Sequence, residues 1–222
     1  MLRSRTIPYL DKQEQAAMTE KAPTDKKSKP NRRQQILEVL AGMLEKNPGE
    51  RITTARLAKE VGVTEAALYR HFPSKGKMFE GLLEFIEETV FARIRLINKE
   101  VPNSVDRLQR ILIFVLAFAE KNPGMCCLIA GGALSGEKPK MRQRAAQFFS
   151  RLETELRQVL REAEIREQKK LRLTGASGAS LLSLNIEGRI HQFVRSEFKI
   201  SPTLGWSNHW PVLAGALFQS IS

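Results

Sequence analysis

Apolar residues recur along this chain at spacings of three and four from Asn31 onward, and no run of alternating β-branched residues interrupts them. This spacing is typical of amphipathic helices and predicts an all-α protein with about nine helices. Helices expected within residues 31–72 are short, and the later ones are longer. We therefore expect a compact head, residues 31–75, joined to a larger helical body, residues 76–222. Helix breakers fall at Asn47 to Gly49, Gly62, Pro73, Pro102, Pro123, Pro139, Gly175 to Gly178 and Pro202.

The stretch from Ile52 to Lys75 has the spacing of a helix-turn-helix. Its first helix has an apolar face, and Gly62 then permits a tight turn. Thr64 is placed to cap a second helix, which ends at Phe72. A second helix in such a pair is the one that enters the major groove of DNA.

The outward positions of the second helix carry hydroxyl, small and basic side chains that can reach base edges or phosphates. Tyr69 could instead be a partly buried aromatic residue, and His71 could instead cap the helix C-terminus. Residues at the start of the first helix, and at the start of the helix after Ser74, are further candidates for contacts with the DNA backbone. The expected DNA-contacting residues are Arg32, Arg33, Thr53, Thr54, Thr64, Ala66, Tyr69, Arg70, His71 and Lys75.

Composition and charge support a nucleic-acid partner. The chain of 222 residues is 42% apolar, enough to fill a core, so disorder throughout is excluded. Its net charge is +12, which favours DNA, RNA or an anionic membrane as partner. Residues 26–77 hold 12 basic and 5 acidic side chains, so much of the excess lies in and before the head.

Other classes of protein lack support. The chain has 3 histidines, which are scattered, and its 2 cysteines are the adjacent Cys126 and Cys127. No nucleophile signature or phosphate loop is present, so we expect neither an enzyme nor a cofactor or metal site. No signal peptide and no run of apolar residues long enough to span a membrane is found, and we expect a cytoplasmic protein.

The first residues, 1–30, are polar, contain three prolines and show no sustained periodicity, so they are expected to form a flexible arm. Met18 offers a second possible start, which leaves open whether residues 1–17 belong to the native protein.

In the body, the helix after Ser74 and the helix that follows it each have an apolar stripe that is expected to face the core. On the second of these helices, Phe114, Ala117 and Lys121 share the face opposite the stripe. An exposed Phe114 there, edged by Lys121 and Arg93, would form a trough suited to a peptide with apolar anchors and acidic groups. The alternative is that Phe85 and Phe114 are covered by other body helices. Phe91 also lies off the expected core stripe of the helix after Ser74. The two stripes consist of Phe79, Leu82, Leu83, Ile86, Val90, Ile94 and Ile97, and of Leu108, Ile111, Leu112, Val115 and Ala119.

Two apolar helices near the C-terminus suit a four-helix seam between two copies, which would place two recognition helices about 34 Å apart on DNA. The alternative is that they complete the core of one copy. Their apolar residues are Leu182, Ile186, Ile190, Phe193, Val194 and Phe198, followed by Trp206, Trp210, Leu213, Ala214 and Leu217.

The run LYRHFPSK followed by Met78-Phe79 resembles the DNA-binding head of the TetR family, and RITTARLA, VGVTEAALYRHFPSK, LLEFIEE, EKNPG, LRQVLRE and FVRSEFK resemble its nucleoid occlusion members. The resemblance implies an all-helical homodimer on palindromic DNA, with the number of dimers per site left open. It implies, further, a nucleoid-associated protein that contacts the C-terminal tail of FtsZ, disrupts its filaments and blocks septum formation over the chromosome. The positions matching the FtsZ groove are Phe85, Arg93, Phe114, Ala117, Lys121 and Asn122.

The resemblance is weaker at residues 131–141 and at Cys126 and Cys127, which depart from the family's pattern and are expected near the body surface. A ligand-controlled TetR-type repressor is the alternative function, because it would share every residue of the head. A closed internal cavity together with a buried Phe114 would favour the repressor, and an open surface trough the division inhibitor.

Overall fold

The computed structural model describes residues 32–134 and 139–219, and the regular elements within them are helices joined by loops and turns, which confirms the expected all-α class. Leu171 and Phe218 form an isolated antiparallel β-bridge outside the helices. The expected arm, 1–30, lies outside the described residues. The helices are α2 (Arg32–Lys46), α3 (Thr54–Val61), α4 (Glu65–His71), α5 (Lys75–Glu100), α6 (Ser104–Lys121), α7 (Pro123–Ile129), the 3-10 turn η1 (Gly132–Leu134), α8 (Pro139–Arg166), α9 (Gly175–Arg195) and α10 (Trp206–Leu217).

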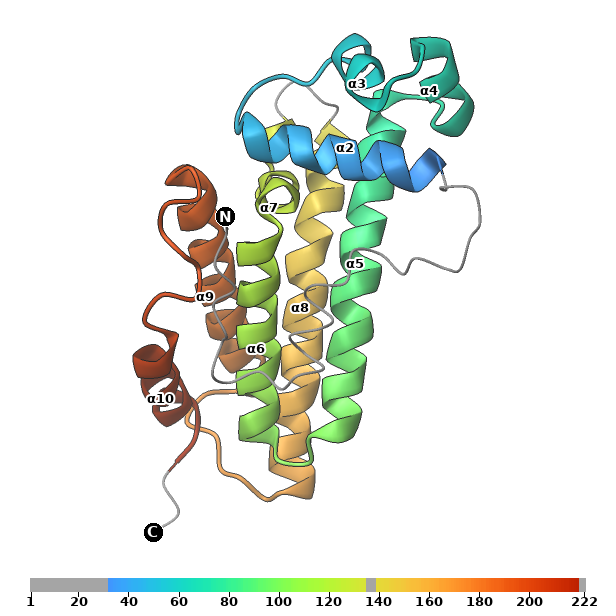
Figure 1. Ribbon diagram of the computed structural model, residues 1–222. Coiled ribbons are helices and arrows are strands. Elements are labelled where there is room, and N and C mark those ends of the chain that lie inside the picture. The colour runs from blue at the N-terminus through green and yellow to red at the C-terminus, as the bar shows by residue number, and fades with distance from the viewer. Residues whose placement is uncertain (1–31, 135–138, 220–222) are drawn as a thin grey trace.

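The head consists of α2, α3 and α4, which lie across one end of the long body helices (Figure 1). The turn between α3 and α4 is made by Gly62, whose φ of 76° places it in the left-handed region that glycine adopts without strain. Thr64 caps α4 as expected, because its hydroxyl accepts a hydrogen bond from the amide of Ala67. Leu68 and Phe72 are buried, so this helix is anchored by its inner side.

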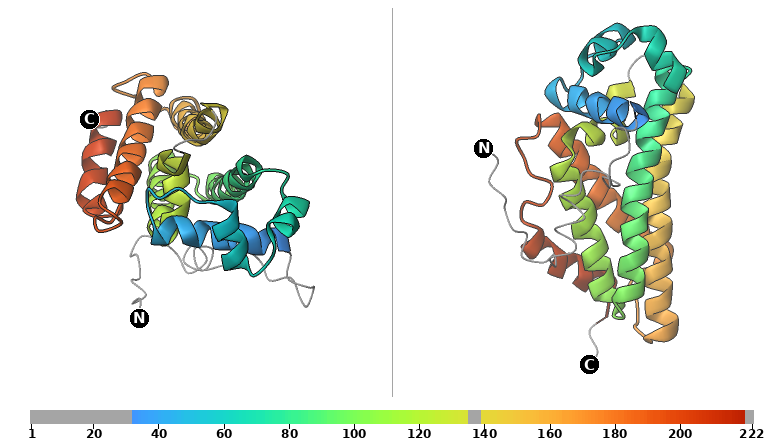
Figure 2. Two further views of the ribbon diagram at one scale, coloured as in Figure 1. Left: turned by 90° about the horizontal axis from the view of Figure 1, so that it is seen from above. Right: turned by 45° about the vertical axis from the view of Figure 1, so that its right-hand side comes forward.

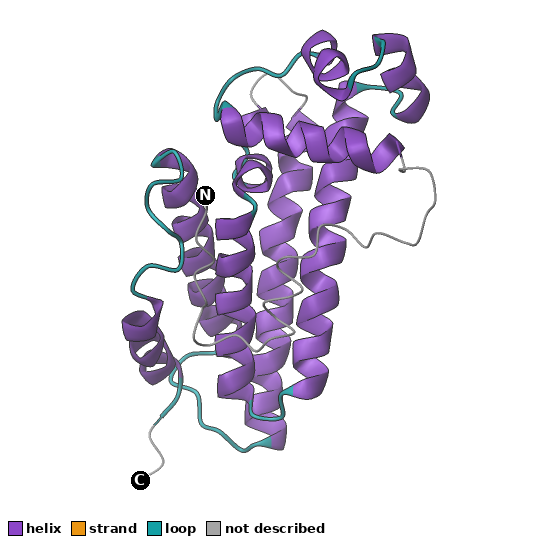
Figure 3. Ribbon diagram, in the orientation of Figure 1, coloured by secondary structure: helices purple, strands orange, loops and turns teal. Residues whose placement is uncertain are grey.

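The body is a bundle in which α5, α6, α8 and α9 run side by side, as the view from above also shows (Figure 2). Every residue of the expected α5 stripe is buried, which confirms the periodicity there. Phe91, off that stripe, is buried as well. Its ring lies 5.5 Å from the ring of Phe148 and 4.0 Å from the guanidinium carbon of Arg151, both on α8. A second side of α5 is therefore buried against α8. The helices of the body and the loops that join them are seen in Figure 3.

The expectation that Phe114 and Ala117 are exposed is wrong. Phe114 is 2% exposed and Ala117 is 0% exposed. The physical reason is that α6 lies in the middle of the body and contacts α5, α7, α8, α9 and α10, so its apolar residues are buried around most of its circumference. The Phe114 ring also packs 6.4 Å from the ring of Phe118.

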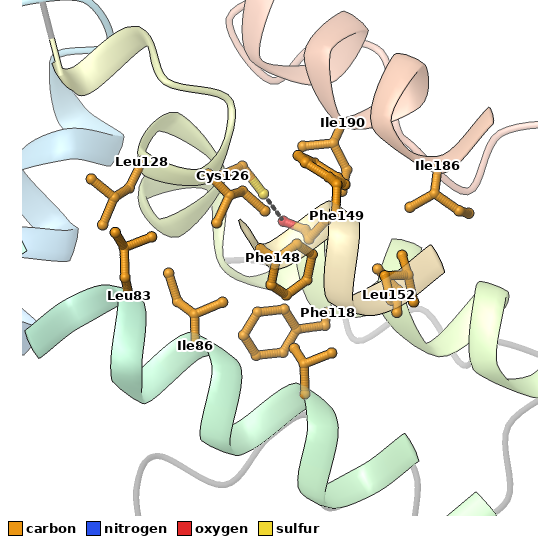
Figure 4. Close-up of a cluster of buried hydrophobic side chains, with 14 of the residues drawn as sticks. Leu83, Ile86, Phe118, Cys126, Leu128, Phe148, Phe149, Leu152, Ile186 and Ile190 are labelled. Atoms are coloured by element: carbon orange, nitrogen blue, oxygen red, sulfur yellow. Dashed lines mark hydrogen bonds between the residues drawn. The ribbon is translucent and has the colours of Figure 1, made fainter. Parts of the chain in front are cut away.

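The head is held to the body where α2 crosses α7. At this crossing Gly124 allows the two backbones to meet, because a β-carbon on it would lie 2.0 Å from the carbonyl oxygen of Ala41. Cys127, next along α7, directs its thiol toward the carbonyl oxygen of Leu44 at 3.6 Å. Both cysteines are buried, so the expectation that they lie near the body surface is wrong. Figure 4 shows Cys126 among apolar side chains from several helices, including Leu83, Phe118 and Phe149.

The C-terminal helices pack mainly onto their own chain. The expected seam residues Leu182, Ile186, Ile190 and Phe193 of α9 are buried in the single copy, as are Trp206, Trp210 and Leu217 of α10. These side chains therefore contribute to the core of one copy, whereas the other expected seam residues, Val194, Phe198, Leu213 and Ala214, are only partly buried. A seam between two copies stays a prediction. The large apolar residues that α9 and α10 leave exposed are Leu181, Leu184 and Val212.

Among the described helices, none taken singly has the length and apolar character needed to cross a membrane. The pair α6 and α7, bent by 110° at Asn122, meets both criteria when its two members are taken together.

Candidate functional site

The outer side of α4 presents the side chains expected to reach DNA. Thr64, Ala66, Arg70 and His71 are exposed, and Tyr69 is 44% exposed, whereas Leu68 is fully buried. The helix therefore exposes its polar side to solvent. It lies in the head, beyond one end of the long body helices (Figures 1 and 2). This exposure agrees with the expected placement of all five residues.

A hydrogen-bonded chain joins α3 and α4 on this side of the head. The Thr54 hydroxyl donates to Oε2 of Glu65 at 2.7 Å, and the Tyr69 hydroxyl donates to Oγ1 of Thr54 at 3.4 Å. Thr53 caps α3 by accepting from the amide of Arg56 at 3.2 Å. These contacts fix the relative placement of the two helices and leave the Tyr69 ring beside the start of α3. Glu65 was not an expected site residue, and its signal in the sequence was only its position in the first turn of a helix.

Lys75 occupies the first turn of α5, after the cap formed by Ser74. Its ammonium donates to the carbonyl oxygen of Ile52 at 3.0 Å and lies 5.5 Å from the centre of the Phe79 ring. The side chain thus connects the loop before α3 to the start of α5. A phosphate contact by Lys75 would have to be made from this tethered position.

The two arginines at the start of α2, Arg32 and Arg33, contact different parts of the head. Arg32 is exposed and donates to the side-chain oxygen of Gln35 at 2.7 Å. The guanidinium of Arg33 lies 4.6 Å from the centre of the Phe72 ring, at the C-terminal end of α4. Arg33 therefore helps to join α2 to the recognition helix. Lys26, Lys27 and Lys29, which contribute to the positive charge of residues 26–77, lie outside the described residues.

The residues matched to the FtsZ groove occupy what we call the α5–α6 face, defined by Phe85, Arg93, Phe114, Ala117 and Lys121. Lys121 is exposed at one end of this face and Phe85 is half-buried. Arg93, at its middle, is 6% exposed, and its Nη1 lies 3.8 Å from Oε2 of Glu100. The expected open apolar trough is thus replaced by a face whose middle is buried.

Asn122, the remaining matched residue, ends α6 and begins α7. Its side-chain amide donates to the carbonyl oxygen of Phe118 at 2.8 Å, so it holds the turn between the two helices.

A cavity of about 370 Å³ lies at the other end of the same face, where α5 turns into α6. Acidic, basic and apolar groups share its wall. The lining residues are Glu100, Val101, Pro102, Asp106, Gln109, Arg110 and Ile113. Behind it the buried Arg107 donates to the carbonyl oxygens of Val101 and Pro102 and to Glu162, which fixes the turn. The cavity opens between exposed residues of this turn, so it is not the closed internal chamber that a ligand-controlled repressor would need.

In the part of the chain that the structure describes, no three His, Cys, Asp or Glu side chains are grouped so as to hold a metal ion. Burial raises the pKa of the Cys126 thiol, and it raises the pKa of Cys127 to about 11.

Two family models match the chain, in the order of its two parts. Residues 36–82 match the bacterial regulatory proteins of the tetR family, and residues 102–218 match the SlmA-like, tetracyclin repressor-like C-terminal domain. The boundary between the two matches falls within α5 and the turn that follows it.

Curated relatives extend the likeness over most of the chain. It is 53% identical to the nucleoid occlusion factor SlmA of Marinobacter nauticus over 190 residues, which cover 86% of this chain and 97% of that protein. It is 54% identical to the nucleoid occlusion factor SlmA of a Marinomonas species over 186 residues, 84% of this chain and 94% of that one.

Solved structures share the fold at low identity. The fatty acid degradation regulator FadR of Bacillus halodurans superposes with a TM-score of 0.74 at 14% identity, covering 85% of this chain and 97% of that chain. FadR of Bacillus subtilis, solved in complex with stearoyl-CoA, gives a TM-score of 0.68 at 15% identity, with 82% and 97% covered. These likenesses concern the fold alone.

Proposed function

This chain belongs to the SlmA family of TetR-type proteins, and from that premise we propose that it is a nucleoid occlusion factor which binds DNA through α4 and FtsZ through its body. The observation that carries the proposal is the polar outer side of α4, exposed at the tip of a head whose inner side is anchored by Leu68 and Phe72.

DNA binding follows from this geometry and from charge. The exposed hydroxyls and the small Ala66 suit close approach to base edges, and Arg32, Arg70 and Lys75 suit phosphates. The net charge of +12 adds a sequence-independent attraction to the duplex. Binding measured by fluorescence anisotropy on a library of duplexes should identify a palindromic site.

We propose that two copies bind that site, because a twofold axis presents two recognition helices to successive turns of one side of the duplex. The exposed apolar residues Leu181, Leu184 and Val212 on α9 and α10 support a seam at this side of the body. Sedimentation equilibrium of the parent chain and of Leu184→Glu should distinguish a dimer from a monomer.

The second partner is FtsZ, whose C-terminal tail we place on the α5–α6 face. The support for this placement is the family membership together with the exposed Lys121 and the half-buried Phe85 at one end of the face, since its middle is buried. An exposed ammonium beside a partly exposed aromatic ring suits a peptide with acidic and apolar groups. Acting from the nucleoid in the cytoplasm, the protein would then antagonise FtsZ filaments near the chromosome.

Pelleting of FtsZ filaments with and without the cognate duplex tests this function. Loss of pelleted polymer that depends on both the protein and the duplex is the expected result. Polymer that stays in the pellet while the protein is fully DNA-bound would contradict the FtsZ assignment, although the DNA-binding assignment would stand.

The second candidate is a ligand-controlled repressor, which the burial of Phe114 favours. The open, charged cavity at the α5–α6 turn argues against it. A repressor would release its operator when a small molecule binds the body, so a screen of fatty acyl and other apolar ligands for operator release separates the two functions.

A further inference from the structure

We propose that Glu65 reads one cytosine in each half of the DNA site, by accepting a hydrogen bond from the exocyclic amine of that base in the major groove. This inference rests on the DNA-binding function proposed above and deepens it, because it assigns a base to one position of the site. Thr54 orients the carboxylate for this contact and is therefore a positioning residue.

Glu65 lies among the side chains that would enter the groove. It is the first residue of α4, whose sequence is EAALYRH, and the one acidic residue of that helix. Its side chain is exposed, as are those of Ala66 and Arg70. Tyr69 lies one helical turn farther along the same face, because residues four apart are neighbours on the surface of a helix. The recognition helix thus carries a negative charge on its DNA side.

One oxygen of this carboxylate is engaged, and the other is open to a partner. Oε2 accepts a hydrogen bond from the Thr54 hydroxyl at 2.7 Å, and that hydroxyl accepts one from Tyr69 at 3.4 Å. Within the described residues, Oε1 makes no hydrogen bond and the carboxylate makes no ion pair. The side chain is therefore held through Oε2 before DNA binds, which lowers the entropy cost of a contact through Oε1.

The charge of Glu65 makes this contact selective. Glu50, in the loop before α3, is neutralised by Arg56 at 2.8 Å, whereas the contact of Glu65 is with a hydroxyl. Phosphates repel such a carboxylate, so it weakens binding to every sequence in which no base offers it a donor. A residue of this kind discriminates between sequences by penalising the wrong ones.

Cytosine is the base whose major-groove edge suits a carboxylate. An ionised carboxylate only accepts hydrogen bonds. Guanine presents two acceptors, thymine an acceptor and a methyl group, and adenine an amine donor next to the acceptor N7. Cytosine presents its N4 amine with no acceptor beside it. An amide, which both donates and accepts, pairs instead with adenine.

Sequencing of the duplexes that the protein retains from a randomised palindromic library measures the base preference at every position. The parent chain should prefer cytosine about tenfold at one position of each half-site. Glu65→Gln should change that preference to adenine, and Glu65→Ala should abolish it, while the other positions keep theirs. Glu65→Ala should also bind a non-cognate duplex about threefold more tightly, because a charge that phosphates repel has been removed.

Matched variants separate this contact from a general effect of charge or folding. Glu60→Gln, exposed on α3, removes the same charge outside the hydrogen-bonded chain and should leave every base preference unchanged. Thr54→Val removes the orienting hydroxyl and should weaken the cytosine preference at the same position. Thr54→Ser keeps the hydroxyl and should restore that preference. Melting curves of each variant report whether the head remains folded.

A modified base tests the contacting atom. In N4-methylcytosine a methyl group replaces the amine proton that points into the major groove, while pairing with guanine is retained. Placed at the selected position, it should weaken binding by the parent chain about tenfold, the scale of one hydrogen bond to a charged group. Glu65→Ala should bind the modified and unmodified duplexes equally.

Three results would overturn the proposal. An unchanged base profile in Glu65→Gln would exclude Glu65 as a reader, although the DNA-binding function would stand. Loss of preference at all positions together would make Glu65 a contact that only holds α3 against α4. A folded parent chain without sequence-selective binding would overturn the proposed DNA-binding function together with this inference.

Discussion

Gly124 of α7 lies so close to Ala41 of α2 that a β-carbon on it would be 2.0 Å from the Ala41 carbonyl oxygen. Because that atom belongs to a helix backbone, it cannot rotate away as a side chain would. Gly124→Ala should therefore lower the free energy of unfolding by about 2 kcal/mol or more, measured by chemical denaturation. Gly42→Ala is the matched control on α2. Its β-carbon would meet open space, and it should stabilise the protein by about 0.5–1 kcal/mol. Equal effects of the two substitutions would contradict this account of the α2–α7 crossing.

Tyr69→Phe removes the hydroxyl that lies beside Thr54 on the outer side of the head. We expect about tenfold weaker binding to the cognate duplex, the scale of one hydrogen bond to a charged group. The thermal midpoint should change little, because the contact is exposed. Anisotropy titrations and a melting curve on the same preparations check both statements, and unaltered affinity would remove Tyr69 from the DNA interface.

Arg70 is exposed on α4 and is expected to neutralise a phosphate. Arg70→Ala should reduce the slope of log K against log salt by about one, because one fewer counterion is released on binding. Arg95→Ala on the body changes the net charge equally and should leave the slope as it is. An undiminished slope in Arg70→Ala would place that guanidinium away from the backbone of the duplex.

Stability should depend on pH through Glu162. Hydrogen bonds from Gln158 and Arg107 hold the pKa of its carboxyl below its ordinary value, with Arg166 nearby. A carboxyl whose pKa is lowered by folding stabilises the protein above its unfolded pKa, and this contribution is lost as the pH falls through the folded value. The difference in unfolding free energy between the parent and Glu162→Gln should therefore be largest near neutral pH and shrink below about pH 4. Glu164→Gln, on the exposed side of α8, is the matched control for the loss of one carboxylate.

The two adjacent thiols should be inert while the protein is folded. Burial raises the pKa of both, and the thiolate is the form that reacts. At about pH 8 an aromatic disulfide reagent should leave them unmodified in buffer and label both in guanidinium chloride. Rapid labelling of the native protein would contradict this expectation.

The sequence was sufficient for features that depend on neighbours close along the chain. The cap at Thr64, the turn at Gly62 and the stripe from Phe79 to Ile97 follow from local backbone preferences and from helical periodicity, and all are found. The polar outer side of α4 was predictable for the same reason, because a short helix with one apolar side exposes the other.

Features that depend on distant contacts were not predictable in this way. Phe91 and Phe114 lie off the stripes of their helices, yet each is buried because more than one neighbouring element covers its helix. Burial of Cys127 depends likewise on the crossing of α7 with α2, a contact between residues about 80 positions apart, and burial of Cys126 depends on body helices that are also distant in sequence. The hydrogen bond from Lys75 to the carbonyl oxygen of Ile52 depends on the path of the loop before α3. The spacing of apolar residues does not predict that path.

The unbroken course of α5 from Lys75 to Glu100 means that the DNA end and the cavity end of the molecule belong to one rod. At 1.5 Å per residue this rod is about 39 Å long, so a tilt of about 5° at its upper end displaces its lower end by about 3 Å. Under the proposed function, a tilt of the head on a duplex would therefore displace the distant α5–α6 turn, and DNA would influence a surface that it does not touch.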